Sequence, residues 1–364
     1  MRINVIQFCL DASPSSGVNC FCTQLNEALG EVQGSKFKVE SCIVRSYAEL
    51  LSQTSKRLNL RTSKPLNLQP SLILHIHGIW LKEQNRAAVW ARKHGVPIVW
   101  STHGMTSPWA IRSKWWKKIP AWWIYQKRNL KDAALLHVTT ELEMGWNRRA
   151  GLENKAIIVP LGTHLPALGQ SNNPTIKQSN NFTVLFVGRI HPLKGLMNLI
   201  RAAAILNQTI KQSNNPTILF RLVGPDECGH KAELQAECDR LGVSVAFVGE
   251  KHGEELEREY ENCDILILPS FTENFGGVVV DALAHAKPVI ASKSTPWERL
   301  ESSRCGWWTE NSPESLAKTI AAAANLPREE LERMGERGRR LVEENYTWEA
   351  VAKKMAEGYG SLDV

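Results

Sequence analysis

The stretch DILILPSFTENFGGVVVDALAHAKPVIAS, residues 264–292, decides the fold of this chain. Its apolar run from Ile265 to Leu268 predicts a strand buried on both faces, as in a parallel sheet. Pro269 and Ser270 end that strand, and the pattern then predicts a helix over roughly 278–286 and a short strand over 288–292. This order is typical of an open α/β sheet, which binds its ligands at the carboxyl ends of the strands.

The turn between the first strand and the helix has the features of an anion site. Gly276 and Gly277 open the helix, where the first-turn N–H groups lack partners and the helix dipole favours negative charge. Without a Cβ atom, each glycine lets a phosphate approach the backbone closely. Glu273 precedes the turn, and Asp281 follows Gly277 by one helical turn on the same face. We therefore expect a diphosphate at the helix start, with one carboxylate on each side for hydroxyl groups.

These motifs resemble the donor-binding signature of the family 4 retaining glycosyltransferases, which is Pro-Ser, Glu, Phe-Gly and seven further residues before a second acid. The resemblance implies that Glu273 contacts the transferred sugar. It implies that Asp281 holds the nucleotide ribose, although the family usually has glutamate there, one methylene longer. The turn residues Asn274, Phe275, Gly276 and Gly277 are then donor-binding as well.

Length and composition are those of a globular chain with two domains. The chain has 364 residues, of which 43% are hydrophobic and 22% charged. Its formal charge of +7 indicates an anionic partner such as a nucleotide or a lipid headgroup. The eight cysteines are scattered and form no Cys-x-x-Cys pair, so we expect reduced thiols in the cytoplasm. The first residues read as a strand rather than a signal peptide, and no apolar run of about 18 residues predicts a membrane span.

The first half of the chain carries histidines at predicted strand ends. A strand over 3–10 leads into a turn at Gly17, which serves either the turn itself or, by the family resemblance, the donor phosphates or the acceptor. The strand predicted over 71–79 places His75 and His77 on one face. We expect His75 to be a buried, hydrogen-bonded imidazole. For His77, at the end of the strand, a structural role and an acceptor contact remain equal alternatives.

His103 follows the strand predicted over 97–102 and precedes a glycine, so it can reach a ligand where the backbone turns. Thr102-His103-Gly104-Met105 matches a recurring pattern of the resembled family, in which this histidine contacts the donor sugar or its leaving group. Further on, Thr139-Thr140-Glu141-Leu142-Glu143 opens a helix with a capping-box-like pattern. Capping accounts for Glu143, so Glu141 is the better site candidate.

Residues 108–131 have an unusual composition: five of the thirteen tryptophans, seven Lys or Arg, and no acid. We expect Pro120 to divide the segment into two short helices, with Trp115, Trp116, Trp122 and Trp123 on one side. Basic segments with tryptophan suit an anionic membrane surface. The alternative is an inter-helix core with solvated lysines. Nucleic acid is not expected, because no nucleic-acid module frames the segment.

The second half begins after a polar linker, 166–181. TIKQSNN occurs at 175–181 and again at 209–215, and we interpret the repeats as inserted surface loops. In FTVLFVGRIHPLKG, a strand ends at Gly188, Arg189 follows, and Lys194 precedes a helix. Two cations in one such loop can neutralise a diphosphate, the role that the resemblance also assigns to them. The resemblance places Gly224, Gly249 and Glu250 at the nucleobase.

Together these patterns predict α/β architecture with two doubly wound, Rossmann-like domains facing a cleft, the arrangement called GT-B. The first spans 1–165 and is joined by a terminal helix over 347–364; the second, spanning 182–346, binds the donor. The resemblance implies hexose transfer from a nucleotide-diphosphate sugar to a glycan or lipid-linked acceptor, with retention, in surface polysaccharide or lipopolysaccharide synthesis. His103, Glu273, Arg189 and Lys194 would carry catalysis without a metal ion, and the chain has no Asp-x-Asp pair. The alternatives are an epimerase or hydrolase of the same fold, and a non-catalytic, membrane-associated sugar-nucleotide-binding protein.

Overall fold

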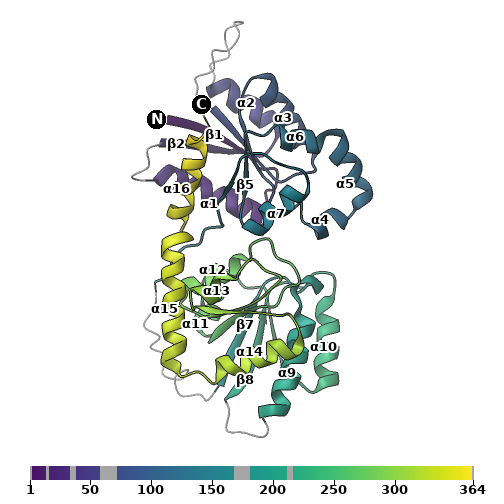
Figure 1. Ribbon diagram of the computed structural model, residues 1–364, viewed down its shortest axis with the longest axis vertical. Coiled ribbons are helices and arrows are strands. Elements are labelled where there is room, and N and C mark those ends of the chain that lie inside the picture. Colours follow the sequence, from purple (N-terminus) through teal and green to yellow (C-terminus); the bar gives the residue numbers. More distant parts are fainter. Residues whose placement is uncertain are drawn as a thin grey trace. The chain divides into compact units, whose positions relative to one another are not determined.

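A computed structural model describes residues 2–13, 16–32, 38–57, 72–167, 181–210 and 216–362. The chain divides into two compact units: unit 1 comprises Met1–Gly162 with Trp348–Val364, and unit 2 comprises Thr163–Thr347. Each unit contains one six-stranded sheet whose strands alternate with helices along the chain (Figure 1). The predicted α/β class with two doubly wound domains is therefore confirmed. Most of the predicted linker and of the repeated polar segments lies outside the described residues.

Unit 1 has the strand order β2-β1-β3-β4-β5-β6, with all neighbouring strands parallel. The chain runs from β1 outward to β2 and then returns past β1 to β3, so the order reverses between β1 and β3. The elements are β1 (Arg2–Phe8), α1 (Gly17–Glu31), β2 (Lys38–Val44), α2 (Tyr47–Arg57), β3 (Leu72–His77), α3 (Lys82–Lys93), β4 (Ile98–Ser101), α4 (Pro108–Arg112), α5 (Trp115–Ala121), the π-helical turn η1 (Trp122–Gln126), α6 (Lys127–Lys131), β5 (Leu135–Val138), α7 (Glu141–Arg149), β6 (Ala156–Ile158) and the terminal α16 (Trp348–Gly360).

Helix α16 belongs to unit 1 although it ends the chain. Its apolar face, with Val351, Met355 and Tyr359, is fully buried in one hydrophobic cluster with residues of α1 and β1. Gly162 makes this return of the chain compact, because a Cβ there would lie 2.5 Å from the Trp348 ring. The terminal helix is thus part of the first core rather than an appendage.

Unit 2 has the strand order β12-β11-β10-β7-β8-β9, again with parallel neighbours. Its order reverses between β7 and β10. The elements are β7 (Asn181–Val187), the 3₁₀ turn η2 (Pro192–Lys194), α9 (Leu196–Ile210), β8 (Thr217–Val223), α10 (His230–Leu241), β9 (Ala246–Gly249), α11 (Glu254–Glu261), β10 (Ile265–Leu268), α12 (Gly277–Ala284), β11 (Val289–Ser292), α13 (Arg299–Ser302), β12 (Gly306–Thr309), α14 (Pro313–Ala324) and α15 (Arg328–Asn345).

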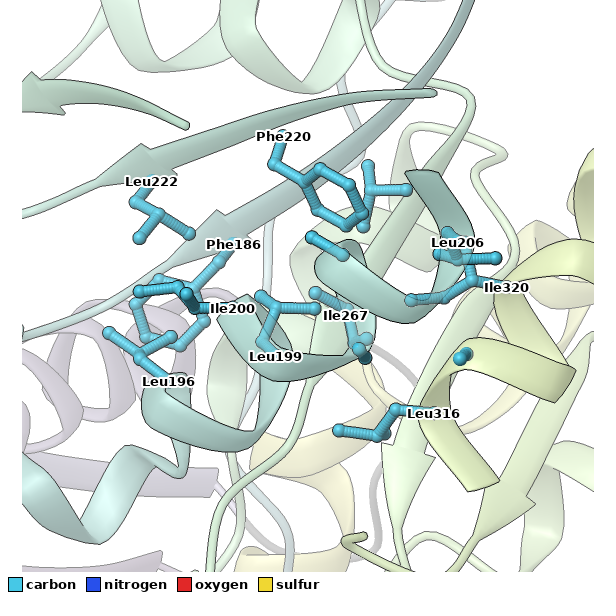
Figure 2. Close-up of a cluster of buried hydrophobic side chains, with 14 of the residues drawn as sticks. Phe186, Leu196, Leu199, Ile200, Leu206, Phe220, Leu222, Ile267, Leu316 and Ile320 are labelled. Atoms are coloured by element: carbon cyan, nitrogen blue, oxygen red, sulfur yellow. The ribbon is translucent and has the colours of Figure 1, made fainter. Parts of the chain in front are cut away.

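A hydrophobic core covers one face of the unit 2 sheet. Phe186 of β7 and Phe220 and Leu222 of β8 pack against Leu199 of α9, and Leu316 of α14 closes the cluster (Figure 2). Successive strand residues point to opposite faces, so a strand covered on both sides needs apolar residues at every position. Burial of this kind contributes about 25 cal/mol per Å² of apolar surface, and it fixes the strand ends that carry the site.

The prediction of a break at Pro120 is wrong. Helix α5 continues through Pro120 into η1 and then α6, and Ala121 and Trp122 keep right-handed helical dihedral angles. Proline lacks an N–H, so the helix loses one backbone hydrogen bond at Pro120 but continues. The actual interruption comes earlier, at Lys114, whose φ is 54°.

Candidate active site

The candidate donor site lies at the carboxyl edge of the unit 2 sheet, where β7 and β10 are neighbours. The chain leaves this pair in opposite directions along the sheet, the arrangement that opens a crevice for ligands in α/β proteins. The loop after β7 contains the two predicted cations, and the loop after β10 contains Glu273 and the glycine turn. The topology therefore brings together two motifs about 80 residues apart in the sequence.

The two loops are joined to each other by the backbone. The N–H of Phe271 donates to the carbonyl of Leu193 over 2.8 Å. Gly195 has a φ of +67°, and a Cβ there would lie 1.9 Å from the carbonyl oxygen of Pro269. Only a glycine fits this close approach, so the loop after β7 is held against the loop after β10 without help from a ligand.

Lys194 and Glu273 form an ion pair across the junction of these loops. The Lys194 Nζ lies 2.7 Å from Glu273 Oε2, and each side chain is 16% exposed. Such a shielded pair holds both groups in place more firmly than a solvent-exposed one. Because Lys194 contacts one carboxylate oxygen, the other oxygen of Glu273 can accept from sugar hydroxyl groups.

The start of helix α12 adjoins this pair. Gly276 is the N-cap residue with a φ of +82°, and a Cβ there would lie 2.9 Å from Leu268 Cδ2 and 3.2 Å from Glu273 Cγ. The glycine therefore lets the carboxylate side chain lie directly against the helix start. The N–H groups of the first turn, beginning at Gly277, present partial positive charge where an anion would bind.

Arg189, the other predicted cation, has a different partner. Its Nη1 lies 2.8 and 2.7 Å from the two carboxylate oxygens of Glu227, and the pair is exposed to solvent. An exposed pair of this kind contributes about 0–1 kcal/mol, so Arg189 can exchange Glu227 for a phosphate at little cost. Arg189 and Lys194 thus belong to the same loop but pair with different acids, Arg189 with Glu227 and Lys194 with Glu273.

Asp281, the predicted ribose ligand, is half-buried and engaged within unit 2. Its Oδ1 accepts a hydrogen bond of 2.7 Å from Thr163 Oγ1. Burial raises the pKa of Asp281 to about 6, an effect that the Thr163 hydrogen bond partly opposes. The folded protein therefore disfavours the ionised form of Asp281, as is typical of carboxylates at binding sites.

The remaining predicted donor residues divide into backbone and surface positions. Gly188 and Gly224 have φ angles of +146° and +143°, and a Cβ on Gly224 would lie 2.0 Å from the carbonyl of Gly188, so tight packing of the strand ends requires Gly224. Gly249, with a φ of +87°, ends β9. Glu250 is exposed beside His252, with 3.3 Å between the Glu250 Oε1 and the His252 Nε2. No contact in the described residues assigns these positions to a nucleobase.

Packing explains the side chain of Phe275, and no close contact requires a glycine at position 17. Phe275 is 5% exposed and packs edge-on against Trp297, with ring centroids 5.3 Å apart. Its side chain belongs to the core, although Asn274 and the backbone around it remain in the turn. Gly17 is exposed at the first residue of α1 in unit 1, and a Cβ there would meet nothing within 4 Å.

His103 lies at the carboxyl edge of the unit 1 sheet, directly beyond β4. Its φ of +48° is unusual for a non-glycine residue, and residues held in this way concentrate at functional sites. Its Nε2 lies 3.1 Å from the Nδ1 of His77. Burial lowers the pKa of His103 to about 4, so the imidazole is neutral at pH 7. A neutral ring can donate a hydrogen bond from one nitrogen and accept one at the other.

Glu143 holds the backbone around His103. Its Oε1 accepts from the Thr102 hydroxyl over 2.7 Å and from the Gly104 N–H over 2.5 Å, and its Oε2 accepts from the N–H and the hydroxyl of Thr139. Burial alone would raise the pKa of this carboxyl, but the hydrogen bonds outweigh it and keep the pKa below its ordinary value. Glu141, which the sequence favours over Glu143 as the site candidate, is exposed and lies outside this network.

His75 is the structural histidine that the sequence predicts. Its two ring nitrogens lie 2.7 Å from the Tyr359 and Ser101 hydroxyls, and Ser101 in turn contacts His137. Burial, reinforced by the neighbouring imidazoles, holds the pKa of His75 well below its ordinary value. This buried polar chain fixes the terminal helix α16 to the sheet.

The basic tryptophan segment forms an exposed apolar patch on unit 1. Half of the large hydrophobic side chains exposed in the described residues belong to it, and we define this tryptophan patch as Trp109, Trp115, Trp116, Ile119, Trp123 and Ile124. Trp122 is not part of it, because its ring packs inward against Trp80. The expectation that all four central tryptophans share one side is therefore wrong, because Trp115, Trp116 and Trp123 are exposed while Trp122 packs inward. Within the described residues, no helix has the length and apolar character needed to cross a bilayer.

Comparison with known proteins gives family matches over most of the chain. The model described as Glycosyl transferases group 1 matches residues 170–341, and the model described as Glycosyl transferase 4-like domain matches residues 30–162. The D-inositol 3-phosphate glycosyltransferase of Salinispora tropica is 29% identical over 186 residues, which are 49% of this chain and 38% of that protein. The chain therefore spans less than half the length of this curated relative.

Two solved structures resemble the chain along its whole length. Sucrose-phosphate synthase from Thermosynechococcus elongatus has a TM-score of 0.71 at 19% identity, over 99% of both chains. The Anabaena protein HepE in complex with UDP-glucose has a TM-score of 0.71 at 18% identity, over 99% of this chain and 100% of its own. At these identities the likeness establishes the fold, which is that of GT-B proteins.

Proposed function

Because this chain belongs to the group 1, family 4-like glycosyltransferases, we propose that it transfers a hexose from a nucleotide-diphosphate sugar to a glycan or lipid-linked acceptor, with retention at the anomeric carbon. The observation that carries the proposal is the Lys194–Glu273 pair beside the Gly276-led start of α12. It combines a fixed cation, a helix terminus and a carboxylate at the switch point of one sheet. The UDP-glucose bound in the Anabaena structure is a donor of the same class.

In this mechanism the site stabilises the departing diphosphate. Negative charge develops on the leaving group as the glycosidic bond breaks, and donors that are already in place reduce its energy without reorganisation. Lys194 and the N–H groups at Gly277 supply that charge stabilisation, and Arg189 adds a second cation after it leaves Glu227. Glu273 orients the sugar through its hydroxyl groups, and Asp281 binds the ribose. Neutral His103 donates a hydrogen bond to the sugar or the leaving group.

We also propose that this chemistry proceeds without a metal ion. The positive charge that a metal would supply to the diphosphate comes from Lys194, Arg189 and the helix start. With EDTA in the assay, transfer should continue within about twofold of its untreated rate, since a tenfold loss corresponds to about 1.4 kcal/mol of transition-state stabilisation. A loss of more than tenfold that Mg²⁺ or Mn²⁺ restores would contradict this part of the mechanism.

The donor part of the proposal is tested by isothermal titration with UDP, GDP and ADP, each with and without its hexose. Lys194→Gln should weaken the preferred nucleotide by about 10- to 100-fold, because a charge-assisted hydrogen bond contributes about 1.5–3 kcal/mol. The matched control is Lys155→Gln, since Lys155 is an exposed lysine of unit 1, directly before β6. Equal affinities for the two variants would contradict the proposal.

The reaction itself is tested with labelled nucleotide hexoses and a membrane lipid extract. Label transferred to lipid supports the proposed activity, and the anomeric configuration of the product tests retention. Conversion of the donor without any acceptor would instead identify an epimerase or hydrolase. Binding of the nucleotide sugar without any turnover would identify a sugar-nucleotide-binding protein that lacks catalysis.

The tryptophan patch supports a lipid-linked acceptor, as in surface polysaccharide or lipopolysaccharide synthesis, and a place on the inner face of the plasma membrane. Indole rings suit the headgroup level, and each nearby cation adds about 1 kcal/mol at an anionic surface. Replacing Trp115, Trp116 and Trp123 together by Ala should abolish co-sedimentation with vesicles rich in phosphatidylglycerol. Leu51→Ala with Val89→Ala, two exposed apolar residues of the same unit, is the control. Full co-sedimentation of the folded triple variant would refute the membrane role.

A further inference from the structure

The carboxylate of Asp281 is held by a residue from outside its own helix. Thr163, with which the chain enters unit 2, donates its hydroxyl to Asp281 Oδ1 over 2.7 Å. Among the described residues, this is the one hydrogen bond made by the Asp281 carboxylate. Asp281 is half-buried and lies one turn beyond Gly277 at the start of α12. Its second oxygen, Oδ2, is therefore left to accept from a ligand bound at the helix start.

Backbone contacts hold Thr163 in place independently of its hydroxyl. Its N–H donates to the carbonyl of Tyr346 over 2.8 Å. Three residues further on, Arg339 of α15 donates from Nη2 to the carbonyl of Pro166 over 3.0 Å. Because neither contact uses the side chain of Thr163, its hydroxyl is presented to Asp281 from a fixed backbone, and its removal leaves that backbone supported.

The surroundings of Asp281 oppose its ionised form. Burial raises the pKa of Asp281 to about 6, and the hydrogen bond from Thr163 is the strongest of the influences that lower this pKa. The titratable groups that face the carboxylate from the elements around it are Glu257 and Tyr260 of α11, His285 after α12, and His164 beside Thr163. Glu257 pairs with His285 over 2.6 Å. Arg339 of the packed α15 is engaged with the carbonyls of Ala284 and Pro166.

The Thr163 hydroxyl affects Asp281 in two ways that matter for a ribose. A carboxylate turns readily about the bond that joins it to Cβ, and the hydrogen bond at Oδ1 fixes that rotation. A hydrogen bond to the charged form also favours ionisation. An ionised carboxylate accepts at both oxygens, whereas a protonated one loses acceptor capacity. Both effects prepare Asp281 to accept hydrogen bonds from hydroxyl groups.

We propose that Thr163 is a positioning residue for the nucleotide, because its hydroxyl fixes the Asp281 carboxylate in the direction and state that accept from the ribose hydroxyl groups. This role rests on the proposed function, in which Asp281 binds the ribose. Thr163 acts through Asp281 rather than by touching the nucleotide. It extends the donor site to the chain that enters unit 2, 118 positions before Asp281.

Titration calorimetry on the full chain at pH 6 and pH 8.5 tests the role, with whichever of UDP, GDP and ADP binds most tightly. Thr163→Val should weaken binding by about tenfold at pH 6, the effect of one lost charge-assisted hydrogen bond. At pH 8.5 the carboxyl is ionised in both proteins, so the loss should shrink to about threefold or less. Thr163→Ser keeps the hydroxyl and should restore wild-type affinity. Thr183→Val, at a half-buried threonine near the amino end of β7, is the matched control and should change neither value.

A second titration shows whether the effect reaches the ribose. The 2′,3′-dideoxy form of the same nucleotide lacks the hydroxyl groups that Asp281 would accept from, so wild type and Thr163→Val should bind it equally. A purely structural role of Thr163 would weaken both nucleotides alike and at both pH values.

The inference is overturned if Thr163→Val binds the nucleotide as tightly as wild type, if its loss is equal at pH 6 and pH 8.5, or if the dideoxy form shows the same loss. It is also overturned if Thr183→Val loses as much affinity. Each of these results leaves the proposed donor site standing, because the wild-type chain still binds the nucleotide. If the wild-type chain binds none of the three nucleotides, the proposed function fails, and the role of Thr163 fails with it.

Discussion

Replacement of Glu143 by Gln tests whether this buried carboxylate positions His103. The Glu143 carboxylate accepts from four donors, two at each oxygen, and it has no exposed surface. Glutamine keeps the shape but turns one oxygen into an NH₂ group. Whichever way the amide faces, that NH₂ group meets a backbone N–H, either that of Gly104 or that of Thr139.

The cost follows from these contacts. One buried N–H loses its acceptor, at about 1–3 kcal/mol, and the remaining hydrogen bonds lose the strengthening that an ionised acceptor gives. We expect a total near 3 kcal/mol, which lowers the melting temperature of a unit of this size by roughly 6–12 °C. Because the left-handed conformation of His103 depends on its neighbour Gly104, we also expect kcat to fall by about tenfold or more at a temperature where the variant is folded.

The assay is thermal unfolding by circular dichroism together with initial rates of transfer. Glu141→Gln is the matched control, since Glu141 is an exposed residue of the same helix turn and should cost less than about 0.5 kcal/mol. A merely structural role would lower the melting temperature but leave kcat of the folded protein unchanged. Equal behaviour of the two variants in both measurements would refute the positioning role.

Three further predictions concern the ionisation and backbone of the site. Burial lowers the pKa of His103 to about 4, so its contribution to stability, about 3 kcal/mol at most, is complete above pH ~6.5 and is lost as the pH falls through about 4. In the Asp281→Asn variant, which lacks the opposing titration of Asp281, the urea midpoint should therefore drop over that window and stay level from pH 7 to 8. The pKa of Asp281 is raised to about 6, so the pH dependence of stability has the opposite sign: the contribution of Asp281 is lost as the pH rises through about 6. Asp281→Asn should therefore stabilise the protein by about 2 kcal/mol at pH 8 and hardly at pH 4. The same variant should weaken nucleotide binding in titration calorimetry. Gly276→Ala should cost about 1–2 kcal/mol for its left-handed φ of +82° plus a clash with Leu268, whereas Gly229→Ala, with a φ of +74° and open space around it, should show the backbone cost alone; equal costs by urea unfolding would exclude the close packing.

The fold was predictable because buried parallel strands leave an unambiguous pattern. The run Ile265 to Leu268 is apolar at every position, and such runs alternate with helical segments along both halves of the chain. Tryptophan and proline misled where a local rule met its exception. Pro120 lies inside a continuous helix that passes into a π turn, and Trp122, the first residue of that turn, packs inward against Trp80.

The site was predictable in its motifs but not in its pairings. Lys194, Glu273 and Gly276 carry spacings that indicate their roles, and the structure brings them into contact. Sequence spacing does not reveal which acid forms an ion pair with which cation, so the sequence did not predict the Arg189–Glu227 pair. Thr163, the partner of Asp281, lies 118 positions away in the sequence. The role of Glu143 was recognisable in principle. Its capping pattern places it at the start of a helix, and that helix start lies close to the end of β4, where His103 follows.

A crystal structure of the chain with bound UDP tests the central claim most directly. We predict that the diphosphate lies about 3 Å from the Gly277 N–H and from the Lys194 Nζ, with the ribose hydroxyl groups at Asp281. A diphosphate bound away from the start of α12, with the Lys194–Glu273 pair unchanged and out of contact, would contradict the account.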